Sequence, residues 1–588
     1  MLNDVNIKKS YIGICPGLVK ALPISWLLFL LQMFNVIFFN VCYSVSWCYS
    51  KLFVLFKGGR DKLDCGNYRG ISIMNTLAKM YDMLLLYRLK LWVSIDKCQA
   101  GAQQGRGCIE QIMTLRLLCD YANFKKCKLY VLFIDFSKVY DRVPRGKLIE
   151  VLRSLGCGSV MLRALQAMYA CTRSVLRSAT IDATAGVRQG APSSCLLFTV
   201  YMDQLVRMLR RSVGNDGFLG TLHSLLLMDD IVLLATSRDM CLRKLSVVMD
   251  FCHEYGMVLN EKKTKVMVIR GMDRDKEPLI LQDVKIDYSS IYSYLGAWFS
   301  DDAKVNTILD LHEKSGEAQV NKFAIFCAAN ANMPFIFKRK VFEAAMTSSL
   351  LYSSETWLVV RPRKIIAQYN RSLKCLLGVR KFTSPDLCMV ESGIHPAQDV
   401  IDKKRHNFLK SKLSTQHEEE PFYLAFKLCE TANTPGYKFL SQALRYDTNV
   451  NPLDRLRRRI MDKPQNASKF VTYRTQINPG LSVHSVYESK NYIPDYKRQA
   501  FTRLRLMSHN LKIETGRRHG IPSELRLCSC TNASVQDESH VLLYCSLSRH
   551  YRNEYHMLDF SSMYNLMGSC EHAGYLCEYI YNVMKLYM

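Results

Sequence analysis

The chain has no internal repeat and no low-complexity tract over its 588 residues. Repeat arrays and compositionally biased disordered segments are therefore excluded as its main architecture. Its 22 cysteines follow no regular spacing, so the sequence offers no disulfide framework of the kind that staples small secreted domains. We expect mostly buried free thiols and a reducing compartment, with the nucleus and the cytoplasm both compatible.

Acidic residues are too few to balance the basic ones. Lys and Arg number 79 against 52 Asp and Glu, which gives a formal net charge of +27. A charge of this sign and size fits a polyanionic partner, either nucleic acid or an anionic membrane surface. Apolar residues make up 49% of the chain, enough to bury a core, and the length indicates about three or four domains.

One segment near the N-terminus lacks charge entirely. No Asp, Glu, Lys or Arg occurs between Lys20 and Lys51. The segment is long enough to cross a bilayer, which takes about 20 apolar residues, but Gln32, Asn35 and Asn40 interrupt it. It begins too far into the chain, and lacks the small-residue cleavage site, to be a secretory signal. We expect apolar helices packed against the following domain, with a membrane span as the alternative.

Two adjacent aspartates, Asp229 and Asp230, stand inside an otherwise apolar run from Leu225 to Ala235. Ionised carboxylates in such a run must reach solvent, an opposite charge or a cation. The pattern predicts two buried strands with the acidic pair at the tight turn between them, and a plain hairpin turn is the alternative. Another apolar run, Leu129–Ile134, predicts a buried strand that ends at Asp135.

If these strands share a sheet, the three carboxylates meet. Carboxylate oxygens are the ligands of hard cations such as magnesium. Two such ions about 3.5–4 Å apart stabilise the attacking and the leaving oxygen of an in-line phosphoryl displacement. We therefore expect Asp135, Asp229 and Asp230 to form a two-metal site. Apolar spacing separately predicts helices over Lys147–Leu155 and Cys195–Leu209.

Six sequence blocks in a fixed order include these aspartates. They resemble the reverse transcriptase domain of non-LTR (LINE-type) retrotransposons, most clearly over residues 51–300. Trp47 and Phe56-Lys57 are similar to the lead-in of that family, and Tyr352–Trp357 gives a weaker match downstream. The six blocks are Asn67–Ser72, Phe133–Asp141, Gly186–Ser194, Leu227–Asp230, Asn260–Lys265 and Tyr294–Gly296.

The resemblance implies an RNA-directed DNA polymerase, a nucleotidyltransferase that adds deoxynucleotides to a primer 3′-hydroxyl with Mg²⁺ or Mn²⁺. Its implied partners are an RNA template, a DNA primer and deoxynucleoside triphosphates. It implies that Asp135 and Asp229 chelate the metal ions and that Asp230 completes the catalytic triad. Full elements of the family normally encode an endonuclease, and only about 50 residues precede the motifs, so we expect a truncated copy without that domain.

The resemblance also implies a nucleotide-binding set. Phe136 would offer a backbone carbonyl to a metal ion, Tyr140 would exclude a ribose 2′-hydroxyl, and Lys263 would contact the departing pyrophosphate. The remaining members of the set are Gln189 and Gly190, against the incoming nucleotide and the template, and Arg69 and Arg106, near the triphosphate. From the residues alone, a packed core aromatic, a helix start and solvated lysines explain the same positions.

The chain departs from the family pattern at three positions. Leu227 and Met228 stand where the family usually has an aromatic residue and then Ala, and Cys195 stands where Pro is common. None of these changes removes a metal ligand. The alternative to a working polymerase is a catalytically decayed remnant that still binds nucleic acid.

A cluster of thiol and imidazole side chains lies near the C-terminus: Cys528, Cys530, His540 and Cys545. These ligands suit tetrahedral zinc, and the segment resembles the terminal zinc knuckle of the same elements. The first spacing is tighter than the commoner Cys-x-x-Cys, so His550 as a substitute ligand and chance clustering stay open. The basic run Lys497–Arg518 just upstream is expected to grip nucleic-acid phosphates or to form a solvated basic face.

Together these patterns predict an α+β fold of the right-hand polymerase type, with a helical C-terminal region. The expected domains are an apolar N-terminal segment over residues 1–50, fingers and palm over 51–300, a helical thumb-like region over 301–420, a linker-like region over 421–495, and a basic C-terminal region with the Cys/His cluster over 496–588.

Overall fold

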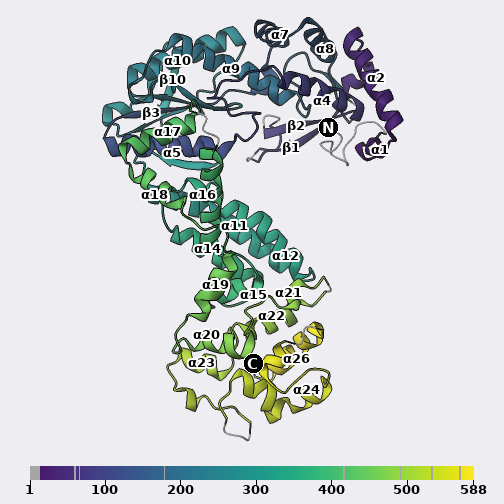
Figure 1. The fold of residues 1–588 in the computed structure, drawn as a ribbon, viewed down its shortest axis with the longest axis vertical. Helices are drawn as coiled ribbons and strands as arrows, with labels where there is room; N and C mark the ends of the chain where they lie inside the picture. Colours follow the sequence, from purple (N-terminus) through teal and green to yellow (C-terminus); the bar gives the residue numbers. More distant parts are fainter. Residues whose placement is uncertain are drawn as a thin grey trace. The chain divides into compact units, whose positions relative to one another are not determined.

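The computed structural model describes residues 14–58, 61–64, 67–177, 179–414, 418–490, 492–530, 534–568 and 571–587. It divides into two units, which are described separately. Unit 1 comprises Met1–Ala303 and Gln416–Tyr437, and unit 2 comprises Lys304–Thr415 and Lys438–Met588. Within the described ranges, unit 1 holds all the β-strands, and unit 2 is built of helices (Figure 1).

A six-stranded sheet forms the centre of unit 1. Its strands are β3 (Leu129–Ile134), β6 (Ser224–Leu227), β7 (Asp230–Ala235), β8 (Lys265–Ile269), β9 (Leu279–Leu281) and β10 (Val284–Tyr288). They lie in the order β6-β7-β3-β8-β10-β9, and only the neighbours β8 and β10 run parallel. All six side chains of β3 are buried, which confirms the strand predicted from its apolar sequence.

Two smaller sheets complete the β-structure of unit 1. The first has the order β2-β1-β4-β5 and contains the strand of the first sequence block. The second is a hairpin whose Tyr292 ring stacks on Phe133 of β3 with 4.0 Å between the ring centroids. The strands are β1 (Tyr49–Phe56), β2 (Tyr68–Met74), β4 (Arg173–Leu176) and β5 (Ala179–Asp182), then β11 (Ile291–Tyr294) and β12 (Ala297–Ser300).

The helices of unit 1 that position the site are α4 (Thr76–Lys90), α5 (Cys108–Lys125), α7 (Arg145–Ser154), α8 (Ser159–Ala170), α9 (Ser194–Ser212), α10 (Arg238–Tyr255) and α17 (Pro421–Ala432). The bounds of α7 and α9 confirm the two helices predicted from apolar spacing. α10 packs on β3 and β7, and α5 packs on β3, β6 and β8. α17 packs on α5, where the Cys429 thiol donates to the Leu117 carbonyl at 3.3 Å. The short helix α6 (Val139–Arg142) follows β3.

The N-terminal part of the chain begins with α1 (Pro16–Lys20), and the uncharged segment after Lys20 forms α2 (Ile24–Asn40) and α3 (Val45–Cys48). One face of α2 packs on α8 and on the ring of Tyr81 through Phe34, whereas Trp26, Phe29 and Phe39 are each more than half exposed. No helix within the described part of the chain is both long and apolar enough to cross a membrane.

Unit 2 is helical. Its longer helices are α11 (Val305–Ala329), α14 (Arg363–Leu377), α16 (Ala397–Ser414) and α26 (Ala573–Lys585). The others are α12 (Phe335–Val341), α13 (Ser348–Leu350), α15 (Pro385–Ser392), α18 (Pro435–Ala443), α19 (Pro452–Met461), α20 (Ser468–Thr472), α21 (Ser485–Glu488), α22 (Asp495–Arg505), α23 (Lys512–Arg518), α24 (Arg549–Glu554) and α25 (Met563–Met567).

Residues 421–495 differ from the linker-like region that we expected. They form α17 to α21, whose core side chains include fully buried Leu456 and Tyr473. Pro421, Pro435 and Pro452 each stand at the first position of a helix, where the missing backbone N–H is not needed and the fixed φ favours the helix. Three of the prolines that suggested interruption therefore begin helices.

Two arginines of the basic run, both in α22 (Asp495–Arg505), do not lie on a free surface. Arg498 and Arg505 are each about 2% exposed, and their guanidinium groups pair with Asp495 and Glu391. Their charged ends lie over the rings of Phe335 and Phe501, respectively. These two arginines stabilise the interior of unit 2. They neither bind phosphates at the surface nor belong to a solvated basic face, the two roles expected from the sequence.

The buried pair between Glu391 and Arg505 predicts a large effect on stability. Glu391 also accepts a hydrogen bond from the Tyr473 hydroxyl, so Glu391→Ala leaves a buried guanidinium without its counter-ion. We expect a loss of about 3–5 kcal/mol in the free energy of unfolding, measured by urea denaturation. The matched control is Glu317→Ala, whose ion pair with Arg371 is half exposed and is worth about 0–1 kcal/mol. Equal losses in the two variants would contradict this description of the core.

Candidate active site

Three carboxylates gather at one end of the six-stranded sheet. The antiparallel pairing of β3 with β7 sets Ile134 opposite Ile231, so the next residues, Asp135 and Asp230, leave the sheet beside each other. β6 and β7 are joined by a two-residue turn that contains Asp229. The structure thus brings together the three aspartates singled out in the sequence.

The turn that carries Asp229 has a strained backbone. Met228 has a φ of +60°, in the left-handed region that costs a residue with a side chain about 1–2 kcal/mol. The Tyr140 hydroxyl lies 3.2 Å from the Met228 sulfur, and the Tyr140 ring stacks on Phe198 with centroids 4.2 Å apart. These contacts help to fix the direction in which Asp229 projects.

The fifth sequence block is held directly against Asp135. The Asn260 backbone N–H donates to the Asp135 carbonyl at 2.8 Å, and the Asp135 backbone N–H donates to the Thr264 hydroxyl at 3.2 Å. Lys263 Nζ consequently lies 4.0 Å from Asp135 Oδ2, and the lysine side chain is 70% exposed. Lys263 therefore lies beside Asp135 at the solvent-exposed edge of the site.

The electrostatics of the three carboxylates favour a cation. Desolvation, together with the negative charges of Asp229 and Asp135, raises the pKa of Asp230 to about 6. Desolvation also raises the pKa of Asp229; the charge of Asp135 adds to this effect, and Arg69 opposes it. Mutual repulsion of this kind is relieved when a hard divalent cation binds between the oxygens.

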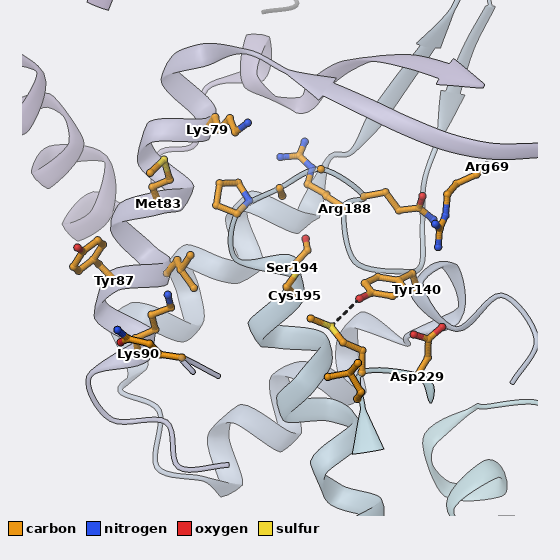
Figure 2. Close-up of a pocket in the computed structure, with 18 of the residues that line it drawn as sticks. Arg69, Lys79, Met83, Tyr87, Lys90, Tyr140, Arg188, Ser194, Cys195 and Asp229 are labelled. Carbon is orange, nitrogen blue, oxygen red and sulfur yellow. Dashed lines mark hydrogen bonds between the residues drawn. The ribbon is translucent and has the colours of Figure 1, made fainter. Parts of the chain in front are cut away.

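Two cavities share the wall that contains Asp229 and Tyr140. The smaller cavity, of about 460 Å³, is lined by Asp135, Asp229 and four basic side chains: Lys57, Arg69, Lys138 and Lys263. The larger cavity, of about 1130 Å³, lies between α4 and the β6–β7 hairpin. Figure 2 shows Lys79, Met83, Tyr87 and Lys90 of α4 on one side of the larger cavity, across from Cys195, Tyr140 and Asp229.

Gln189 lies in the turn of the third sequence block, Gly186–Ser194, and lines both cavities. Its carbonyl accepts from the Ser72 backbone N–H at 3.2 Å, and its side-chain amide donates to Asp141 at 2.8 Å. The next residue, Gly190, has a φ of +104°, and a Cβ there would lie 2.4 Å from the Ser72 carbonyl oxygen. Only glycine permits this approach, which joins the first and third blocks.

The remaining predicted nucleotide-binding residues fall in different places. Arg69 lines both cavities, and Phe136 lines the smaller one while its own side chain is buried against Phe251. Arg106 is not brought to either cavity. Its side chain is 4% exposed and pairs with Glu110 one helical turn along the chain and with Glu420 at 3.9 Å. The nearby carboxylates hold this guanidinium in the core.

The altered positions Leu227 and Cys195 both line the larger cavity. The structure also reveals Gln99, which the sequence analysis missed. Its side chain is fully buried, and its amide contacts the backbone of Met228 from a segment 129 residues away. A single glutamine in no recognised block carries no signal that could have identified this contact.

The C-terminal Cys/His cluster is assembled in unit 2. Cys528, Cys530, His540 and Cys545 offer four ligand atoms that all lie within 4.8 Å of one another. Two sulfurs bound tetrahedrally to zinc at about 2.3 Å are about 3.8 Å apart, and the Cys528 and Cys545 sulfurs are 3.8 Å apart. Burial raises the pKa of the Cys545 thiol, but hydrogen bonds from Tyr587, the backbone and the other thiols outweigh burial and lower it. His550 is not in this group, and its ring lies tilted against that of Tyr551 with 3.9 Å between the centroids.

Comparison with known proteins identifies the middle of the chain. Residues 57–299 match the family model for reverse transcriptase (RNA-dependent DNA polymerase). The Pol polyprotein of the type-2 retrotransposable element R2DM of Drosophila melanogaster is 27% identical over 217 residues, which cover 36% of this chain and 20% of that protein. The probable RNA-directed DNA polymerase from transposon BS of the same fly is 21% identical over 430 residues, 68% of this chain and 46% of that protein.

A third relative, the putative 115 kDa protein of the type-1 retrotransposable element R1DM of Drosophila melanogaster, is 24% identical and covers 65% of this chain and 38% of that protein. The chain therefore spans less than half the length of each of these relatives. Among solved structures, telomerase from Candida albicans in complex with a telomeric RNA fragment aligns over 76% of this chain and 75% of that chain. The identity is 12% and the TM-score 0.34, too low for a correspondence between residues.

The raised pKa of Asp230 predicts a pH-dependent effect on stability. A carboxyl group that is easier to protonate in the folded than in the unfolded protein stabilises the fold at low pH, and this stabilisation is lost as the pH rises through about 6. In EDTA, we expect Asp230→Asn to raise the thermal unfolding midpoint more at pH 7.5 than at pH 5, because the carboxyl group is still mostly protonated in the folded protein at pH 5 and only part of the stabilisation has been lost. Differential scanning fluorimetry at the two pH values measures this, and an equal effect at both would refute the assigned repulsion.

Proposed function

We propose that this chain, whose residues 57–299 form a reverse transcriptase domain of the non-LTR retrotransposon type, extends a primer 3′-hydroxyl by copying an RNA template. The observation that carries the proposal is the meeting of Asp135, Asp229 and Asp230 beside a cavity lined by basic side chains. Acidic and basic groups in this arrangement suit metal ions and a triphosphate together.

The three aspartates fit the divalent ions that such chemistry requires, because they lie at the same end of the sheet and their negative charges raise the pKa of Asp229 and Asp230, a repulsion that a cation would relieve. When bound there, Mg²⁺ or Mn²⁺ would supply activation of the attacking hydroxyl and stabilisation of the leaving oxygen. Asp135 and Asp229 would hold the ions, with Asp230 beside them and the Phe136 carbonyl as a further oxygen ligand.

The smaller cavity fits the incoming nucleotide. Arg69, Lys57 and Lys138 would neutralise the triphosphate, and the exposed Lys263 would follow the departing pyrophosphate. The Tyr140 ring is fixed against Phe198 and faces the cavity, so it would exclude a 2′-hydroxyl by its bulk. Gln189 and Gly190 would lie against the nucleotide and its template base.

The larger cavity fits the nucleic acid. The face of α4 that lines it carries Lys79 and Lys90 at its ends and the half-exposed Tyr87 between them. Lysines attract phosphates, and an exposed aromatic ring offers a surface on which a base stacks. Template and primer would enter here and reach Asp229, which also lines the smaller cavity.

One observation favours a second candidate function, a decayed polymerase that only binds nucleic acid. The departures from the family pattern, Leu227 and Cys195, both line the larger cavity rather than the surface. Substitutions at these two positions would alter how a template–primer duplex fits in the larger cavity, while the basic side chains that attract the duplex are kept.

The Cys/His cluster of unit 2 would bind zinc. The 3.8 Å and 3.3 Å separations within the pairs Cys528–Cys545 and Cys530–His540 suit a tetrahedral ion, which would stabilise the surrounding helices. Its role would be structural, because the four ligands leave no open position for a substrate.

The direct test of polymerisation is primer extension on poly(rA) with an oligo(dT) primer, dTTP and Mg²⁺. We expect extension by the wild type and a loss of at least about a hundredfold with Asp229→Asn, because the metal site supplies several kcal/mol of transition-state stabilisation. The matched control is Asp250→Asn, an exposed aspartate of α10. A wild type that binds the RNA but makes no DNA would support the decayed remnant instead.

The zinc proposal predicts one zinc ion per chain in protein purified without chelator. Cys545→Ser removes a buried ligand, so we expect the metal content, measured by mass spectrometry, to fall to near zero and the thermal midpoint to drop. Cys577→Ser is the control, because Cys577 is equally buried in unit 2 and lies outside the cluster. Equal zinc in the two variants would exclude the site.

A further inference from the structure

A short segment of unit 1 lies along the free edge of the catalytic sheet. β6 is the edge strand, and Gln99 forms a parallel bridge with Leu226 of that strand. The Ala100 N–H donates to the Leu226 carbonyl at 2.7 Å, and the Leu226 N–H donates to the Cys98 carbonyl at 2.9 Å. This segment therefore extends the sheet beside the catalytic hairpin.

The side chain of Gln99 reaches from this segment to the turn itself. Its Oε1 accepts from the backbone N–H of Met228 at 3.0 Å and from the N–H of Gly101 at 2.8 Å. Its Nε2 lies 3.5 Å from the Met228 carbonyl and donates to it. One carboxamide thus contacts both backbone polar groups of the residue that precedes Asp229.

Two features show that this contact is built into the fold. Gln99 has no exposed surface, and both polar groups of its buried amide have hydrogen-bond partners, as most buried polar side chains do. A Cβ on Gly101 would lie 2.8 Å from both Gln99 Oε1 and the Met228 nitrogen, so a glycine is needed to let the three groups approach.

The contact is made to Met228, whose left-handed φ is unfavourable for a residue with a side chain. A strained backbone persists only where its surroundings over-determine it. From these observations we infer that Gln99 is a positioning residue, which holds Met228 in its left-handed conformation and thereby sets where the carboxylates of Asp229 and Asp230 lie relative to Asp135.

The expected effect of Gln99 on DNA synthesis rests on the proposed function, whereas its expected effect on metal binding does not. Gln99→Met keeps the length of the side chain and removes both hydrogen-bonding groups. Gln99→Glu keeps an acceptor for the Met228 N–H but, when ionised, has no hydrogen for the Met228 carbonyl. The control is Gln111→Met, because Gln111 of α5 is equally buried and its amide has no hydrogen-bond partner among the residues that the structure describes.

The test compares these variants in the full chain by two measurements. Mn²⁺ affinity is measured by electron paramagnetic resonance, and kcat and KM for dTTP are measured by primer extension on poly(rA). We expect Gln99→Met to weaken Mn²⁺ binding at least fivefold and to lower kcat at least tenfold, with KM within twofold. Gln99→Glu should follow the same pattern, and Gln111→Met should match the wild type in all three quantities.

A Gln99→Met protein that folds and matches Gln111→Met in kcat and Mn²⁺ affinity would overturn the inference. If Gln99→Met does not fold, the same comparison is made with Gln99→Glu. If neither variant folds, Gln99 has a general structural role, and the inference that it is a positioning residue is overturned as well. A wild type that binds Mn²⁺ but makes no DNA removes the proposed function, and the Mn²⁺ affinities then decide the role of Gln99. A wild-type protein that binds no Mn²⁺ would overturn both the proposed function and the inference about Gln99.

Discussion

The antiparallel pairing of β3 with β7 is the constraint on which the rest of the site depends. Because side chains alternate between the two faces of a strand, a slip of one residue would turn Asp135 away from Asp230. The apolar side chains of both strands are buried on both faces of the sheet, and such a slip would disrupt their packing on each face. The position of the carboxylates is therefore set by the packing of the core beneath them, and not by any attraction between the carboxylates themselves.

The carboxylates oppose this arrangement electrostatically, and the chain surrounds them with features that compensate. Repulsion and desolvation raise the pKa of Asp230 to about 6, while Arg69, Lys57 and Lys263 line the adjoining cavity. The turn is held in a strained conformation by contacts from two distant segments, one at Tyr140 and one at Gln99. Strain and like-charge repulsion concentrated at one point are typical of a site that is completed by its ligands.

The sequence predicted the strand of β3, the hairpin of the paired aspartates and the helices α7 and α9, because apolar spacing and turn residues act over short distances. It could not predict Gln99, whose contact with Met228 spans 129 residues. Arg106 was expected near the triphosphate, but Glu110, four residues along the same stretch of chain, holds its guanidinium away from the cavity. The prolines of residues 421–452 suggested a linker, yet proline at the first position of a helix carries no penalty.

The central claim is that the three aspartates form one metal site at the end of this sheet. Crystals of the full chain with a primer–template and a non-hydrolysable nucleotide, soaked in Mn²⁺, would test it by anomalous diffraction. The account predicts two peaks about 3.5–4 Å apart, both in contact with Asp135 and Asp229. No peak between these carboxylates, with Mn²⁺ found elsewhere in the same crystals, would contradict it.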